Sequence, residues 1–169
     1  MTTKFLLAAA ALAAAASSAS ATTVTDWGVL DSSTKVAFVA YHGDVGAIDD
    51  IYTFSLPALA SVDGYGEEFD ARSVSMTGAK FQLFAGSYGD PGVTPVGAAV
   101  PYSNTEAEVV FSDLDAGKYY FEVTGTSGHS GASYDFEAYA TAVPEPGSVA
   151  LFIAGLSALG FIAKRRSQR

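Results

Sequence analysis

The chain carries an uncharged apolar segment near each end, and these two segments confine any folded domain to the residues between them. Residues 5–16 contain only Phe, Leu and Ala, and residues 147–163 contain no charged side chain. Neither segment has the polar face of a helix that packs on a soluble core. We therefore expect one domain over residues 22–143. That length can bury a core without disulfides, and the chain has no cysteine.

The N-terminal segment has the three parts of a secretory signal peptide. Lys4 supplies a positive charge, the apolar run follows, and small residues with Ala19 and Ala21 in an A-x-A pattern come next. The apolar run is too short to span a bilayer comfortably. The sequence thus predicts a signal-peptide helix within residues 1–21, cleavage by signal peptidase after Ala21, and export from the cytoplasm.

The C-terminal apolar segment predicts a single transmembrane helix over residues 147–163. Such a helix is about 25 Å long, slightly short of a hydrocarbon core of about 30 Å, and flanking residues and local thinning cover the difference. Lys164, Arg165 and Arg166 begin a basic tail, residues 164–169, of the kind that stays cytoplasmic. We expect a single-pass intermediate in the inner membrane, with the domain outside the cytoplasm.

Just before this segment stand Pro144, Glu145 and Pro146, and two prolines around one residue hold a peptide extended. On physical grounds alone the peptide is either a stiff linker or a substrate for an enzyme that reads extended backbone. The order of Pro-Glu-Pro, apolar segment and basic residues resembles the PEP-CTERM sorting signal over residues 144–169. This resemblance implies recognition by an exosortase, a membrane-embedded protease or transpeptidase of Gram-negative bacteria that make exopolysaccharide. It also implies removal of the helix and tail, which releases the domain to the cell surface or extracellular matrix.

The middle of the chain alternates apolar and polar residues and shows no helical period of convincing length. The pattern predicts an all-β fold, an antiparallel, jelly-roll-like β-sandwich of about eight to ten strands. Alternation is clearest in residues 51–56, 119–124 and 133–138, and two runs, 36–41 and 80–85, are apolar enough to face two layers. Turn residues separate the runs, at 42–44, 63–66, 88–92, 113–117 and 125–131.

Four segments of this region, residues 50–56, 81–84, 114–123 and 131–138, carry a second resemblance. In this order they resemble the β-sandwich of bacterial pre-peptidase C-terminal domains and the FxDxF-type ectodomains found on PEP-CTERM proteins. Residues 48–52 depart from the FxDxF pattern by replacing both phenylalanines. Some pre-peptidase-type domains bind calcium or matrix polymers, but the residues that match here are architectural.

Charge and composition exclude several classes of function. Nine Lys and Arg against eighteen Asp and Glu give a net charge of −9, which argues against nucleic-acid binding. The absence of cysteine excludes a thiol nucleophile and a zinc–thiolate site. His129, Ser130 and Asp135 crowd one glycine-rich turn, whereas a triad needs groups from separate elements, so no catalytic residue is assigned. His42 is expected in a turn, and a two-histidine metal site requires the fold to bring His42 and His129 together.

Two groups of acidic residues are candidates for Ca²⁺ binding through oxygen ligands. The first group is Asp44, Asp49 and Asp50, and the second is Asp63, Glu67, Glu68 and Asp70. Neither follows an EF-hand or repeat-type loop, so solvated turn acids are the favoured interpretation, and no cofactor or metal ligand is assigned. By alternation Asp50 shares a face with Tyr52 and Phe54, and we expect its carboxylate to bond the backbone of a neighbouring loop.

Five tyrosines are expected in turns or on the outer face, where they either stack on sugar rings or are ordinary strand residues: Tyr65, Tyr88, Tyr102, Tyr120 and Tyr139. The leading hypothesis is a non-enzymatic exported protein of the cell surface or extracellular matrix. The alternative is a carbohydrate- or calcium-binding module associated with an exopolysaccharide or biofilm matrix.

Overall fold

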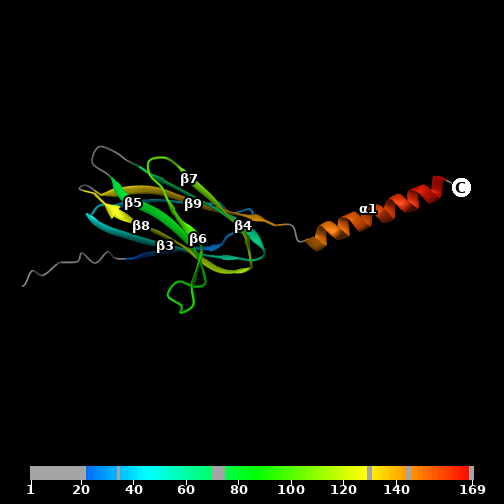
Figure 1. Cartoon of the computed structure of the whole chain (residues 1–169), viewed down its shortest axis with the longest axis horizontal. Coiled ribbons are helices and arrows are strands. Elements are labelled where there is room, and N and C mark those ends of the chain that lie inside the picture. Colours follow the sequence, from blue (N-terminus) through cyan, green and yellow to red (C-terminus); the bar gives the residue numbers. More distant parts are fainter. Residues whose placement is uncertain (1–21, 34, 70–74, 129–130, 144–145, 168–169) are drawn as a thin grey trace, which may run out of the picture.

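The computed structural model describes residues 22–33, 35–69, 75–128, 131–143 and 146–167, which form nine strands and one helix (Figure 1). The strands are β1 (Thr23–Val29), β2 (Lys35–His42), β3 (Gly46–Leu56), β4 (Ala60–Glu68), β5 (Met76–Ala85), β6 (Thr94–Pro101), β7 (Ala107–Leu114), β8 (Gly117–Ser127) and β9 (Ala132–Ala142). The helix is α1 (Pro146–Ser167). The predicted signal-peptide helix and its cleavage residues Ala19 and Ala21 lie outside the described residues.

The strands form two facing sheets, which confirms the predicted sandwich. Sheet A has five strands in the order β1-β3-β8-β5-β6, and sheet B has four in the order β2-β9-β4-β7. From β2 onward the strand order is that of a jelly roll. The prediction of a wholly antiparallel sandwich is wrong at one edge, where β1 pairs parallel with β3. Between β1 and β3 the chain runs back along sheet B as β2. The strand β3 therefore runs in the same direction as β1, and the two pair in parallel.

The alternating runs lie in strands, as the sequence predicts. Residues 51–56 are in β3, 119–124 in β8 and 133–138 in β9, while 36–41 and 80–85 are in β2 and β5. In β9 the burial alternates as expected, since Tyr134, Phe136 and Ala138 are buried and their neighbours are less so. Alternation therefore predicted the elements and, in β9, the inner face. The prediction that residues 36–41 face two layers is wrong, because Val39 and Tyr41 are exposed on the outer side of β2.

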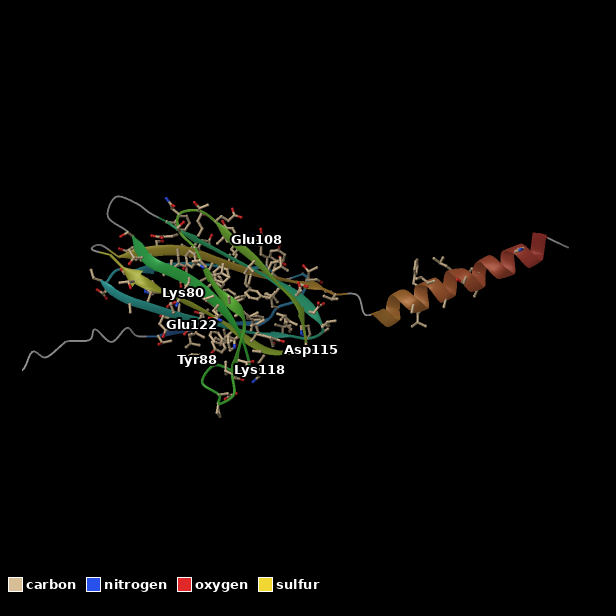
Figure 2. The ribbon with its side chains drawn as sticks, viewed as in Figure 1. Lys80, Tyr88, Glu108, Asp115, Lys118 and Glu122 are labelled. Atoms are coloured by element: carbon tan, nitrogen blue, oxygen red, sulfur yellow. The ribbon has the colours of Figure 1, made fainter. Side chains whose placement is uncertain are left out.

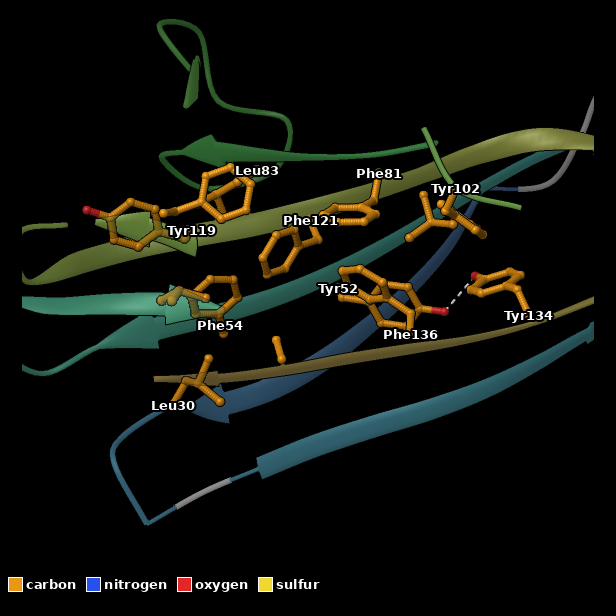
Figure 3. Packing of buried hydrophobic residues seen from close by; sticks show 14 of the residues in the cluster. Leu30, Tyr52, Phe54, Phe81, Leu83, Tyr102, Tyr119, Phe121, Tyr134 and Phe136 are labelled. Carbon is orange, nitrogen blue, oxygen red and sulfur yellow. Dashed lines mark hydrogen bonds between the residues drawn. The ribbon is translucent and has the colours of Figure 1, made fainter. Parts of the chain in front are cut away.

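The core between the sheets combines aliphatic side chains with a group of contacting aromatic rings (Figure 3). Phe121 of β8 has its ring centroid 5.5 Å from that of Phe54, 6.1 Å from Phe81 and 5.0 Å from Phe136. Phe136 comes from sheet B and also lies 5.1 Å from Phe81. Because burying one such ring stabilises a fold by roughly 1.5–3 kcal/mol, these contacts hold the two sheets together.

The turn predicted at 63–66 is wrong, because these residues lie inside β4. A Cβ atom on Gly64 would lie 3.2 Å from the ring of Phe81 and 3.3 Å from that of Phe121. A Cβ atom on Gly66 would lie 3.2 Å from both Phe81 and Tyr102. The two glycines therefore mark a place where aromatic rings lie very close to the strand backbone. Close approach of a neighbouring group is one reason for glycine inside a strand.

The helix α1 extends away from the sandwich (Figure 1), and it contains the apolar segment from which a helix was expected. Its large apolar side chains are exposed where they are described: Leu151, Phe152, Ile153, Leu156 and Leu159. Among the described residues, no helix combines the length and the apolar character needed to cross a membrane. The helix is thus confirmed, whereas the predicted transmembrane span over 147–163 is not.

The contact between β4 and the rings predicts that Gly64→Val destabilises the fold by about 1–3 kcal/mol, because the new side chain enters space that Phe81 and Phe121 occupy. Urea unfolding followed by the fluorescence of Trp27, the single tryptophan, measures the change. The matched control is Gly117→Val, because a Cβ atom there meets only Tyr119, at an ordinary 3.7 Å. Equal midpoints for the two variants would contradict the packing described here.

Candidate functional site

A buried carboxylate, that of Asp50 on β3, lies between the two sheets. It is 3% exposed and shares the inner face with Tyr52 and Phe54, as predicted. Its Oδ2 accepts a hydrogen bond from the hydroxyl of Tyr134 and lies 2.7 Å from Nε2 of His42. The expected bond from Asp50 to a loop backbone is therefore wrong: in the described part of the chain its partners are side chains of β2 and β9.

The number of available protons fixes the direction of the hydrogen bonds in this cluster. Tyr134 uses its one proton on Asp50, so Tyr52, whose hydroxyl oxygen is 2.7 Å away, donates to Tyr134. Because a carboxylate only accepts, Nε2 of His42, the ring nitrogen that faces Asp50, is the donor in their hydrogen bond. Burial raises the pKa of Tyr52 and of Tyr134 well above the ordinary value, so both hydroxyls stay protonated and keep donating.

His42 and Asp50 are residue types that also form the base and the carboxylate of hydrolases. His42 ends β2, rather than standing in the predicted turn, and its bond to Asp50 links sheet B to sheet A. Within the described residues no serine hydroxyl is hydrogen-bonded to its ring. His129 and Ser130 lie outside those residues, and Asp135 lies on the outer face of sheet B. The cluster as described joins the two sheets.

The first predicted group of calcium ligands is divided among three environments. Asp44 is exposed in the connection after β2. Asp49 faces outward from sheet A and accepts a hydrogen bond of 2.8 Å from the hydroxyl of Thr22. Asp50 points inward, to His42 and Tyr134. Because neighbouring residues of a strand point to opposite faces, Asp49 and Asp50 do not converge on one ion.

The second predicted group is also divided. Glu68 is buried and accepts a hydrogen bond of 2.7 Å from the backbone N–H of Met76, while Asp63 and Glu67 face outward and Asp70 lies outside the described residues. The outward side of sheet B, here called the acidic face, carries Asp63, Glu67, Glu108, Asp135 and Glu137. In the described part of the chain, no three His, Cys, Asp or Glu side chains are grouped so as to hold a metal ion.

Burial, with a smaller contribution from neighbouring carboxylates, raises the pKa of three acids on the outer sides of the two sheets. Burial and the charge of Glu108 raise the pKa of Asp63. Burial and the charges of Glu137 and Glu67 raise the pKa of Asp135, although Lys35 opposes this shift. On the outer side of sheet A, burial raises the pKa of Glu122, and the nearby charge of Asp49 adds to it.

The five predicted surface tyrosines occupy different environments. Tyr88 and Tyr139 are exposed, by 42% and 37%, and Tyr65 is half-buried, its hydroxyl 3.2 Å from Glu67. Tyr102 and Tyr120 are buried, so their predicted exposure is wrong. Tyr102 packs in the core against Phe81, whereas Tyr120 lies on the outer side of sheet A beneath neighbouring rings.

A groove of about 410 Å³ lies where β1, β3, the start of β8 and the loop after β5 meet. Tyr88 and Lys118 both line it and lie close together at the base of that loop in Figure 2. Asp26 and Thr53 supply polar groups, and the exposed Val24 of β1 supplies an apolar wall. Of these residues the sequence indicated only Tyr88, because the placement of β1 beside β3 depends on the parallel pairing that alternation does not predict.

The sandwich ends close to the predicted sorting motif. The backbone N–H of Val143 donates to the carbonyl of Leu59, 3.3 Å away, and α1 begins at Pro146. Pro144 and Glu145, the other two residues of the motif, lie outside the described residues. The predicted basic anchor, Lys164, Arg165 and Arg166, falls in the last turns of α1.

Comparison with protein families identifies this C-terminal segment. Residues 142–166 match the PEP-CTERM protein-sorting motif, which confirms the resemblance stated from Pro-Glu-Pro, apolar segment and basic residues. The motif implies an exported protein that an exosortase sorts to the membrane or cell surface. Comparison with curated proteins gives no match.

Several solved structures are similar to part of the chain. The pre-peptidase C-terminal domain of a collagenase from Bacillus anthracis has 17% identity and a TM-score of 0.38, over 72% of this chain and 98% of that domain. PliG of Aeromonas hydrophila, a periplasmic inhibitor of g-type lysozyme, has 15% identity and a TM-score of 0.37, over 72% of this chain and 100% of that one. CorA of Methylomicrobium album BG8, a surface-associated copper-binding protein, has 11% identity and a TM-score of 0.38, over 73% of this chain and 100% of that one. The resemblance to FxDxF-type ectodomains stays a prediction.

The hydrogen-bonded cluster predicts that Tyr134→Phe lowers the free energy of unfolding by about 1–3 kcal/mol, because it removes a donor from a buried carboxylate and the acceptor from Tyr52. Urea unfolding followed by Trp27 fluorescence measures this loss, since the indole stacks 4.8 Å from the ring of Tyr52. Tyr41→Phe is the control, because Tyr41 is 67% exposed. Two indistinguishable unfolding curves would rule out a stabilising role for the cluster.

The raised carboxyl pKa values predict that the domain is more stable at about pH 5 than at about pH 7.5. Asp63, Glu122 and Asp135 hold protons more tightly in the folded state than in the unfolded state, where their pKa is about 4. Between the unfolded and folded pKa values the folded state therefore binds more protons, and stability falls as pH rises through that range. Thermal unfolding at the two pH values tests the sign.

The control for this pH effect compares two aspartates. Asp135→Asn should raise Tm at about pH 7.5 and reduce the difference between the two pH values, since it removes one crowded charge. Asp90→Asn changes an exposed acid in the loop after β5. It should alter neither the Tm at about pH 7.5 nor the difference in Tm between the two pH values. A Tm for the unaltered chain that falls on acidification to about pH 5 would contradict the assignment.

Proposed function

We propose that this chain is a non-enzymatic protein of the cell surface or extracellular matrix, displayed after an exosortase removes its C-terminal segment. The observation that carries the proposal is the match of residues 142–166 to the PEP-CTERM motif, directly after a folded domain. Signal peptidase would first cleave after Ala21, following the A-x-A pattern of Ala19 and Ala21. The chain then stays at the inner membrane, with the sandwich outside the cytoplasm, until it is processed.

The division of the fold supports removal of the segment. The residues of the hydrophobic core lie between Leu30 and Ala140, so the loss of residues 144–169 takes nothing from it. The exposed apolar side chains of α1 contribute nothing to that core, and they are suited to hold the segment at the membrane. Lys164, Arg165 and Arg166 form the basic end of the segment that matches the sorting motif.

The roles of the polar groups favour display over catalysis. The only histidine in the described residues is bonded to Asp50, and this bond joins the two sheets. Asp63, Glu67 and Asp135 spread over the acidic face of sheet B, where they favour solubility and resist association with anionic surfaces. A hydrolase would need these groups to converge on one substrate atom.

The sorting proposal predicts that replacing Pro144, Glu145 and Pro146 together by alanine blocks processing. The variant should accumulate in the membrane fraction at full tail length, whereas the unaltered chain appears at the surface or in the medium without its tail. Immunoblots of both fractions, with one antibody against the sandwich and one against residues 160–169, measure the two forms.

The control for this experiment is Pro91→Ala, a proline substitution in an exposed loop far from the motif in sequence. It should be processed like the unaltered chain, which separates loss of recognition from general effects on export. Processing of the triple variant at the normal rate, or tail retention in all three proteins, would refute exosortase-dependent sorting.

A further inference from the structure

The groove beside Tyr88 has a fixed aromatic wall. The ring of Tyr88 packs edge-on against Tyr120, with centroids 5.4 Å apart, and Tyr120 stacks on Phe84 at 4.9 Å. Tyr120 is buried beneath this contact, while Tyr88 remains 42% exposed. Tyr88 therefore presents an aromatic surface to the groove, supported from behind by two further rings.

The loop that carries Tyr88 is tied to the sheet at its base. The backbone N–H of Gly86 donates to the carbonyl of Lys118 over 2.9 Å, and Gly86 has a φ of 116°, which side-chain-bearing residues rarely adopt. Within the loop, the N–H of Asp90 donates to the carbonyl of Ser87. Tyr88 of the loop and Lys118 of β8 are thus held at one hydrogen-bonded corner, so that a ligand meets them in a prepared position.

The remaining lining of the groove consists of hydrogen-bonding groups beside apolar surface. Asp26 accepts bonds from the backbone N–H of Gly28, at 2.9 Å, and from the hydroxyl of Thr53, at 3.2 Å, both through Oδ1. These bonds fix the carboxylate and leave Oδ2 to accept from a ligand. In the described part of the chain Lys118 forms no ion pair, so its ammonium group is available as a donor.

We infer that this groove binds a neutral polysaccharide, with Tyr88 stacked on a sugar ring and Asp26 and Lys118 bonded to its hydroxyl groups. The ring supplies an amphipathic contact surface, and one fixed acceptor with one donor suits hydroxyls, which both donate and accept. One negative and one positive side chain give the lining no net charge, and the chain as a whole carries −9, which disfavours a polyanion. The groove is partly open to solvent, so a polymer can reach its lining from outside. The inference deepens the proposed function by naming a ligand for the displayed domain.

Affinity electrophoresis tests the inference on the full chain, kept soluble by a polyoxyethylene detergent whose head group contains no sugar. Native gels contain one of five polymers: a β-glucan, a xylan, a galactan, a mannan or, as the polyanion, alginate. We expect at least one neutral polymer to retard the unaltered chain, and alginate to have no effect. Tyr88→Ala should weaken the retardation about tenfold in apparent Kd, as expected for loss of a central aromatic contact, and Tyr88→Phe should retain it.

Tyr139→Ala is the matched control, because it removes a tyrosine of sheet B that is 37% exposed, similar to the 42% of Tyr88. It should bind like the unaltered chain, and thermal unfolding checks that Tyr88→Ala remains folded. Failure of all four neutral polymers to retard the chain, retardation by alginate alone, or equal retardation of Tyr88→Ala would overturn the inference. Binding is measured on the purified unprocessed chain and does not depend on processing by an exosortase. A negative binding result therefore leaves the sorting proposal standing, and a negative sorting result leaves the binding inference standing.

Discussion

The fold depends on contacts between aromatic rings of the two sheets. These contacts require that β4 carry glycine, and so no side chain, at two positions that face the core. Phe81 and Phe121 of sheet A reach Phe136 of sheet B because Gly64 and Gly66 leave room for them. Without that close approach the sheets would stand further apart, and the rings would lose contacts that a dry, dense core requires. The placement of β4 in sheet B, and hence of the acidic face, follows from the same packing.

Much of the sandwich could be predicted from the sequence because alternation is a local signal. The predictions that failed concern features that depend on contacts between residues far apart in the chain. Glycines at 64 and 66 look like turn residues until the rings of distant strands are known. Asp50 was correctly placed on the inner face, but its partner Tyr134 is 84 residues away in the chain, so no local pattern could indicate the bond. Tyr120 alternates like an outer-face residue, and it does face outward, but neighbouring rings bury it. The groove escaped prediction since it depends on β1 pairing parallel with β3.

The chain thus has two parts: a folded β-sandwich, and a C-terminal segment that matches a sorting motif. The sandwich completes its core by Ala140, and its two outer sides differ: sheet B carries closely spaced carboxylates, and sheet A carries the aromatic groove. The C-terminal segment matches the sorting motif over residues 142–166, and its helix α1 extends away from both sheets. The residues of the hydrophobic core all precede this segment.

The most direct test of this division is the intact mass of the mature protein recovered from the surface or medium of its native host. The account predicts a species that begins after Ala21 and lacks Lys164, Arg165 and Arg166, with the sandwich complete. Because the basic residues lie in the last turns of α1, cleavage at any bond before Lys164 removes them. A surface form whose mass still includes residues 164–169 would contradict the account.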